Sequence, residues 1–343
     1  MALLGFGVTA RLAGAEPAAG SPSASDTVEV EVFQGARILS TPRGNMYPAT
    51  ERRIGKEGWV ELNLMIDPHG KPYEVAVVDS IGGPAFEKAA IDLLKQMSFA
   101  PARRGATPTD SSFQFAVSFS LDGPARGARF EFVSLYKKFM EAVDAGDQAR
   151  ADQELSRFDA QNLYEEAYRN YGKYFYDLKW GTEAQQLRDL RGAVRHATTG
   201  DFYLPKNAFV AALAWKFVLE VRANDCGKAL FTWKLLERFA SKDMRKQLQP
   251  TVDQVKRLRD SDTVLPMSAQ IDRGTTWQGV LFRNRFNITV MQGAISEIKL
   301  RCEKGYVFFK YDPRVQYSVS SKVGTCAIDV VGNPGTTFEL IQS

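Results

Sequence analysis

The sequence is poor in the residues from which catalytic and metal sites are usually built. Its 343 residues include two histidines, His69 and His196, and three cysteines. Neither histidine has a cysteine or a carboxylate at metal-ligand spacing, which argues against a zinc site. The chain also lacks a Gly-x-Ser-x-Gly elbow, a phosphate-binding loop and a dinucleotide fingerprint. We therefore predict that the protein is not an enzyme and uses no metal or cofactor.

A strong charge of one sign is missing too. The chain has 44 basic and 40 acidic residues, a formal net charge of +4. Nucleic-acid binding would require a concentrated basic face with stacking aromatics, and no stretch combines the two. Basic residues do gather on predicted helices near residues 242–259, where a solvated helix face is the simpler interpretation. They are Lys242, Arg245, Lys246, Lys256, Arg257 and Arg259.

Long hydrophobic runs are absent as well. The N-terminal apolar run stops at Arg11, at about half of the roughly 20 residues that a membrane-spanning helix needs. Ala13-Gly14-Ala15 fits a small-residue cleavage site, although no basic segment precedes it. We interpret residues 1–26 as a signal-like segment with a short linker; a true start further upstream and a disordered tail are the alternatives. Val28, Val30 and Val32 then alternate with glutamates, which predicts an extra strand.

The chain is organised around residues 42–121, where the spacing of apolar residues indicates strands and a helix in succession. Residues 60–66 alternate as a half-buried strand does, the turn 67–72 follows, and residues 73–77 alternate again, so a hairpin is expected. Pro84 opens a helix whose apolar stripe has helical spacing. The stripe consists of Phe86, Ala90, Leu93 and Met97.

The last strand of this region has the clearest alternation in the chain. Its two faces are Phe113, Phe115, Val117, Phe119 and Leu121 on one side, and Gln114, Ala116, Ser118 and Ser120 on the other. No strand follows it directly to pair with, and it contains no proline or charge to protect an edge. Such an edge can accept an extended peptide as an added strand. The alternative is that another segment of this chain, such as residues 28–32, covers it.

The residues of this region resemble the C-terminal domain of the TonB family over about residues 42–121. The resemblance rests on Tyr47-Pro48, Glu57-Gly58-Trp59-Val60, Ile66-Asp67-Pro68-His69-Gly70, Asp79-Ser80-Ile81-Gly82 and Phe99-Ala100-Pro101-Ala102. TonB proteins are periplasmic energy transducers, and the resemblance implies binding of a receptor peptide, the TonB box, beside the last strand. The peptide-binding residues would be Tyr47, Pro48, Phe113, Gln114, Phe115, Ala116, Val117, Ser118 and Phe119. A Gln-Pro pair common in the family reads Gly44-Asn45 here.

The two segments that follow differ in the spacing of their apolar residues. Residues 126–260 are helical in pattern, and the almost wholly apolar helix from Pro205 to Val221, with Trp215 on it, belongs at the centre of a bundle. Residues 264–343 show seven short alternating runs at even spacing, which favours a β-sandwich or barrel.

Cys302 and Cys326 fall at predicted strand ends, 24 residues apart. In an exported protein they are expected to pair, and closing that loop would stabilise the fold by roughly 3 kcal/mol. Cys226 lies in a helix-to-helix turn and is expected to be a free, partly buried thiol.

Two features of the helical segment leave a choice open. Tyrosines and Phe175 recur at helical spacing over residues 164–176, which fits either core packing or a peptide- or glycan-binding groove. The carboxylates Glu165 and Glu166 are most simply solvent-facing.

The sequence thus predicts an α+β multidomain protein. It comprises a signal-like segment (1–26), a TonB-like antiparallel sheet with helices (27–122), an α-α repeat-like bundle (126–260) and a β-sandwich (264–343). The implied function is TonB-box binding by strand addition in energy-dependent outer-membrane transport; the alternative is a periplasmic adaptor or scaffold. The implied partners are a receptor peptide and an inner-membrane proton-channel complex. The implied location is the periplasm, with an inner-membrane anchor if the true N-terminus lies upstream.

Overall fold

The computed structural model describes residues 33–42, 46–121, 127–198, 202–272 and 274–343. Residues 1–26, the strand expected at 28–32, Gly44-Asn45 and the boundary at residue 122 therefore lie wholly or partly outside the described residues. Within the described part, helices and strands are mixed, and no helix there is both long and apolar enough to cross a bilayer.

The region around residues 33–119 contains a three-stranded antiparallel sheet in the order β4-β3-β8 with a helix packed on it. Two small sheets, β2-β5 and β1-β6-β7, accompany it. The elements are β1 (Phe33–Gln34), β2 (Arg37–Ser40), α1 (Ala49–Arg53), β3 (Gly58–Ile66), β4 (Pro72–Ile81), α2 (Pro84–Lys95), β5 (Ser98–Ala100), β6 (Ala102–Arg104), β7 (Thr107–Thr109) and β8 (Ser111–Phe119).

Helix α2 covers one face of this sheet, which we call the α2 face. Proline at the first turn of α2 suits a position that needs no intrahelical N–H. The core beneath it is apolar, as the alternation of the strands predicts: it contains Val60, Leu62, Leu64, Ile66, Phe86, Ala90, Leu94 and Phe119.

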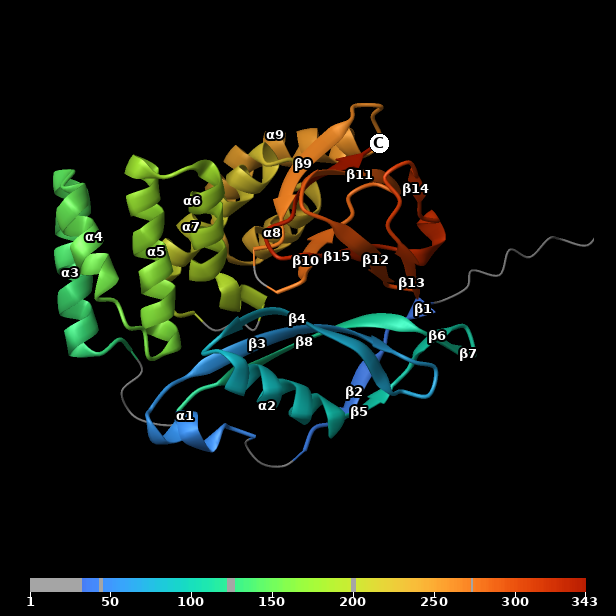
Figure 1. Ribbon diagram of the computed structural model, residues 1–343, viewed down its shortest axis with the longest axis horizontal. Coiled ribbons are helices and arrows are strands. Elements are labelled where there is room, and N and C mark those ends of the chain that lie inside the picture. Colours follow the sequence, from blue (N-terminus) through green and yellow to red (C-terminus); the bar gives the residue numbers. More distant parts are fainter. Residues whose placement is uncertain (1–32, 43–45, 122–126, 199–201, 273) are drawn as a thin grey trace, which may run out of the picture.

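The opposite face of the sheet, which we call the second face, is covered by the rest of the chain (Figure 1). Strand β3 is consequently buried on both sides: Trp59 and Met65 are inaccessible and Asn63 is buried. The expectation of a half-buried strand at 60–66 is therefore wrong. The alternation of apolar and polar residues in β3 is typical of a strand with one exposed face, but segments more than 100 residues later in the chain cover that face.

The helical segment packs as consecutive pairs, with α5 against α6 and α7 against α8. Its elements are α3 (Phe130–Ala145), α4 (Gln148–Ser156), α5 (Leu163–Trp180), α6 (Glu183–Ala193), the 3-10 turn η1 (Arg195–Thr198), α7 (Lys206–Arg222), α8 (Cys226–Phe239) and α9 (Lys242–Arg259).

Three expectations for this segment need correction. Glu165 is inaccessible rather than solvent-facing, because its carboxylate accepts hydrogen bonds from Arg129 Nε at 2.8 Å and Nη2 at 2.9 Å. Trp215 is 53% exposed although α7 itself is central. Cys226 is free, but it begins α8 and is fully buried at 1% exposure. Four tyrosines of α5 pack into two cores, and Tyr174 is buried; the four are Tyr168, Tyr171, Tyr174 and Tyr176.

The C-terminal segment consists of two four-stranded antiparallel sheets, β10-β15-β12-β13 and β14-β11-β16-β9, whose inner faces share one core. Strand β9 was not expected from the sequence. The elements are β9 (Leu265–Gln270), β10 (Thr276–Val280), β11 (Arg285–Gln292), β12 (Ile295–Cys302), β13 (Gly305–Lys310), β14 (Tyr317–Ser318), the 3-10 turn η2 (Ser321–Val323), β15 (Cys326–Gly332) and β16 (Thr337–Gln342). We call this segment the C-terminal sandwich. The expected disulfide is confirmed: Cys302 and Cys326 are bonded, directly opposite each other on β12 and β15.

Candidate functional site

Strand β8 forms one edge of the β4-β3-β8 sheet. It pairs with β3 along its whole length, so that Ser118 faces Trp59 and Gln114 faces Asn63. Within the described part of the chain, no strand pairs with the other side of β8. We call that side the free edge. Because backbone N–H and C=O groups seek partners, a free edge is suited to main-chain recognition of an extended segment.

The side chains of β8 are incompletely covered. On the α2 face, Phe113, Phe115 and Val117 are only half-buried although they pack against the core. On the second face Gln114 is exposed, while Ala116 and Ser118 are half-buried. A neighbouring strand would bury the apolar side chains further, since side chains on adjacent strands contact one another on each face.

Tyr47 meets the apolar row of β8 at its C-terminal end, at Phe119. The Tyr47 ring is buried, with its centroid 5.6 Å from that of Phe86 and 5.9 Å from that of Phe119. Its hydroxyl donates to the carbonyl of Lys56 at 2.5 Å, and burial raises the pKa of Tyr47 to about 12. Pro48 precedes α1 and its carbonyl accepts from Arg52 N. The structure therefore brings Tyr47 to the C-terminal end of β8 as a packing residue.

Glu57 joins the C-terminal end of β8 to the helical segment. Its carboxylate accepts from Leu121 N at 2.9 Å and from Leu163 N at 3.2 Å, and its own N–H donates to the carbonyl of Gln161 at 2.9 Å. Glu57 opens the Glu57-Gly58-Trp59-Val60 stretch noted in the sequence, but nothing in the sequence indicates that its partners lie more than 100 residues away.

The second face is bound to the helical segment by ring and ion-pair contacts. The Trp59 ring meets His196 at a centroid distance of 5.1 Å, and Arg195 Nε lies 2.6 Å from Asp79 Oδ2. Burial, with the nearby Arg195 charge, lowers the pKa of His196 to about 3, so this imidazole is neutral near pH 7. These contacts were not predicted.

Between the second face, helices α6–α8 and the C-terminal sandwich lies a cavity of about 2860 Å³. Glu61 and Asn63 of β3 line it. Burial, together with the charge of Asp79, raises the pKa of Glu61 to about 7, and the charge of Arg195 partly opposes that rise. The described residues contain no group of three histidine, cysteine, aspartate or glutamate side chains placed to hold a metal ion.

Comparison with known proteins identifies the part of the chain that carries this edge. Residues 44–121 match the family described as Gram-negative bacterial TonB protein C-terminal. Protein TonB2 of Pseudomonas aeruginosa is 37% identical over 76 residues, which cover 22% of this chain and 28% of that protein. Residues 44–121 are a TonB C-terminal domain.

Two further similarities concern the same domain. Protein TonB of Haemophilus ducreyi is 31% identical over 91 residues, which cover 26% of this chain and 33% of that protein. The solution structure of the Pseudomonas aeruginosa TonB C-terminal domain matches with 18% identity and a TM-score of 0.24, covering 26% of this chain and 91% of that one. The chain thus spans about a third or less of the length of these two curated relatives. The similarity to the TonB C-terminal domain ends at residue 121 in the family match.

Proposed function

We propose that this protein binds an extended peptide segment of an outer-membrane receptor by adding it as a strand to the free edge of β8. The observation that carries the proposal is that edge, which lies within a TonB C-terminal domain and has no strand partner among the described residues. Main-chain hydrogen bonds along β8 would supply affinity, and the side chains of the peptide would supply specificity.

The half-buried apolar row on β8 supports the same proposal. A strand added at the free edge would cover the remaining exposed area of Phe113, Phe115 and Val117. Burial of apolar surface contributes roughly 25 cal/mol per Å², so the added strand would gain free energy beyond its hydrogen bonds. On this proposal the chain acts in the periplasm, in energy-dependent outer-membrane transport. It couples to an inner-membrane proton-channel complex if the true N-terminus lies upstream and supplies a membrane anchor.

An adaptor role is the second candidate, and one observation favours it. The second face of the TonB C-terminal domain is bound within the same chain, through Trp59 to His196 and through Asp79 to Arg195. A domain held this way can present β8 to a partner protein without transmitting force. An adaptor and a transducer would share the strand-binding edge and differ in whether uptake requires this chain.

Proline substitutions test strand addition. Successive N–H groups of a strand point to opposite sides, so one of Val117→Pro and Ser118→Pro removes a donor from the free edge, and the other removes a ladder bond to β3. The probe is a capped seven-residue peptide of alternating valine and threonine, titrated by fluorescence anisotropy. We expect the free-edge variant to keep the wild-type melting temperature and to lose about tenfold or more in affinity.

The control for this pair is Ser118→Thr, which keeps the N–H and suits a strand, and which should bind the probe as the wild type does. Equal affinities for both folded proline variants and the wild type would contradict binding at this edge, as would a wild-type protein that does not bind the probe.

A further inference from the structure

The β12–β13 hairpin of the C-terminal sandwich extends across the TonB C-terminal domain at the start of β8. Near β4, Lys299 Nζ lies 3.1 Å from Glu74 Oε2, and Arg301 Nε donates to the carbonyl of Glu74. Both strands of the hairpin contact β8. Its tip reaches β1, where Lys304 Nζ stands 5.1 Å from the ring centroid of Phe33. The hairpin tip therefore lies beside the N-terminal end of β8 (Figure 1).

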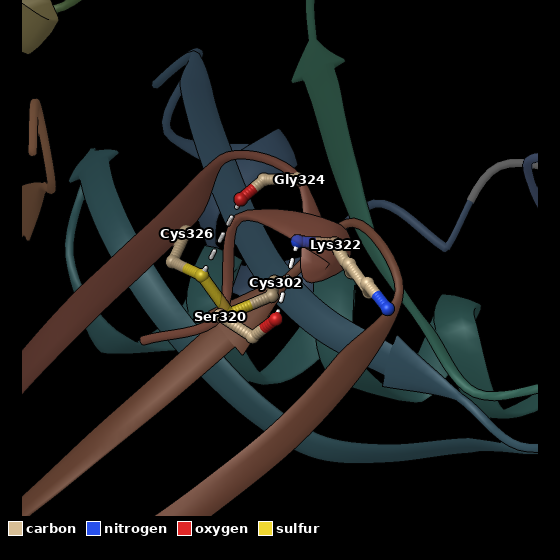
Figure 2. Close-up of a disulfide and its surroundings, with 5 residues drawn as sticks. All are labelled: Cys302, Ser320, Lys322, Gly324 and Cys326. Carbon is tan, nitrogen blue, oxygen red and sulfur yellow. Dashed lines mark hydrogen bonds between the residues drawn. A yellow bond between two sulfur atoms is a disulfide. The ribbon is translucent and has the colours of Figure 1, made fainter. Parts of the chain in front are cut away.

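A disulfide and backbone hydrogen bonds fix the base of the hairpin tip. The disulfide between Cys302 and Cys326 joins the end of β12 to the start of β15 (Figure 2). Backbone hydrogen bonds of 3.0 Å continue beyond it, from Glu303 N to the carbonyl of Thr325 and from Lys304 N to the carbonyl of Val323. These bonds keep Lys304 next to the turn that carries Lys322.

Two cations gather at this place. Lys304 packs on the ring of Phe33 in β1. Lys322 is exposed, with its side chain directed away from the disulfide (Figure 2). We call Lys304 and Lys322 the cationic collar.

Within the described part of the chain, neither lysine forms an ion pair with a carboxylate. Glu303 is the nearby acid of the tip, and its side chain lies against Gly324, a position with φ of 77° that leaves no room for a Cβ. The collar is thus a positive surface at one end of β8, without a carboxylate partner among the described residues.

We propose that the cationic collar binds a carboxylate of the peptide that is captured on β8, and so selects peptides that are acidic at the end lying beside the start of β8. This inference rests on the proposed function. The carboxylate could be an aspartate or glutamate side chain or a free C-terminus, which offer the same chemistry. Charge complementarity at the rim of an interface contributes to partner choice more than to total affinity.

The experiment compares four versions of the valine–threonine probe. One is capped at both ends, one has a free C-terminal carboxylate, and two are capped and carry an aspartate at the first or the last position. We expect a carboxylate at one end of the probe to raise affinity about two- to tenfold over the fully capped probe, because exposed charge pairs are individually weak. The gain should fall as salt is raised from 0.05 to 0.5 M.

Substitutions test whether the collar causes the gain in affinity for probes with a carboxylate. The double variant Lys304→Gln/Lys322→Gln should lose the gain while binding the capped probe as before, and Lys304→Arg/Lys322→Arg should restore it. The control Lys242→Gln/Lys246→Gln changes net charge equally on the exposed start of α9 and should keep the gain.

The outcomes separate this inference from the function on which it rests. If the capped probe binds and no carboxylate improves its affinity, or if the α9 control loses the gain as well, the collar proposal is overturned and strand addition stands. If no probe binds, the proposed function fails and the collar proposal fails with it. If only the free C-terminus improves affinity, the collar recognises a peptide end; if aspartate does so, it recognises a side chain.

Discussion

The two faces of the β4-β3-β8 sheet are covered in contrasting ways. The α2 face is packed mainly by apolar side chains, with Leu62 and Phe86 inaccessible at its centre, and a hydrogen bond from Ser80 Oγ to Glu87 Oε1 lies at its margin. The second face meets the rest of the chain through ring contacts of Trp59 and Tyr73, through an ion pair of Asp79, and across a cavity bordered by Glu61. Glu74 at the same edge of the sheet adds an ion pair with Lys299 of the C-terminal sandwich. The difference indicates that the α2 face holds the TonB C-terminal domain together, whereas the second face holds the domain against its neighbours.

Neighbouring residues of β3 allow the sharpest test of that contrast. Leu62→Ala removes three heavy atoms from the α2 face, and we expect a loss of about 2–5 kcal/mol in the free energy of unfolding, from lost transfer energy and a residual cavity. The measurement is urea denaturation followed by tryptophan fluorescence, with Trp59 of the same strand as a reporter.

Asn63→Ala is the matched control, one residue away on the second face. The Asn63 Oδ1 atom has no hydrogen-bond partner in the described part of the chain, so its removal leaves nothing newly unsatisfied. We expect a loss below about 1 kcal/mol. Similar losses for both variants would contradict the assignment of stability to the α2 face.

A smaller effect is expected from the pH dependence of the second face. The pKa of Glu61 rises from 4.5 to about 7 on folding, so folding favours the protonated carboxyl. Its contribution to stability is therefore fully present below pH 4.5 and is lost as the pH rises through 7. The charges of Asp79, Arg195, Lys216 and Lys228, from β4, η1, α7 and α8, act on this group.

Glu61→Gln, which cannot titrate, isolates the effect. The difference in stability between wild type and variant should change between pH 4.5 and 7, with the wild type losing more as the pH rises. The shift at His196 has the opposite sign, since its contribution is lost as the pH falls from 6.5 through 3, and it cancels in the difference. A difference that stays constant over this range would show that Glu61 keeps an ordinary pKa.

Local patterns predicted the elements that depend on local chemistry. Helix α2 begins at Pro84, as expected, and the alternation in β8 places Phe113, Phe115, Val117 and Phe119 on one face. The disulfide followed from two cysteines at strand ends.

Contacts between distant segments could not be predicted from the sequence. Glu165 lies in a polar stretch of sequence, yet Arg129, 36 residues earlier, takes it out of solvent. Trp59, Glu57 and Asp79 have partners in the helical segment, and hydrophobic period records only that a face is buried, never what covers it. The edge of β8 could be predicted because it follows from the pattern of a single strand. The cationic collar beside it could not, because it depends on contacts between distant segments.

Amide hydrogen exchange along β8 tests the central claim most directly. In the free protein, alternate N–H groups between residues 112 and 119 should exchange slowly because they bond to β3, while those at the free edge exchange fast. Saturation with the capped valine–threonine probe should slow the fast set at every second residue and leave the slow set unchanged. An unchanged pattern in β8, with protection appearing elsewhere in the chain, would contradict capture of a peptide by strand addition at this edge.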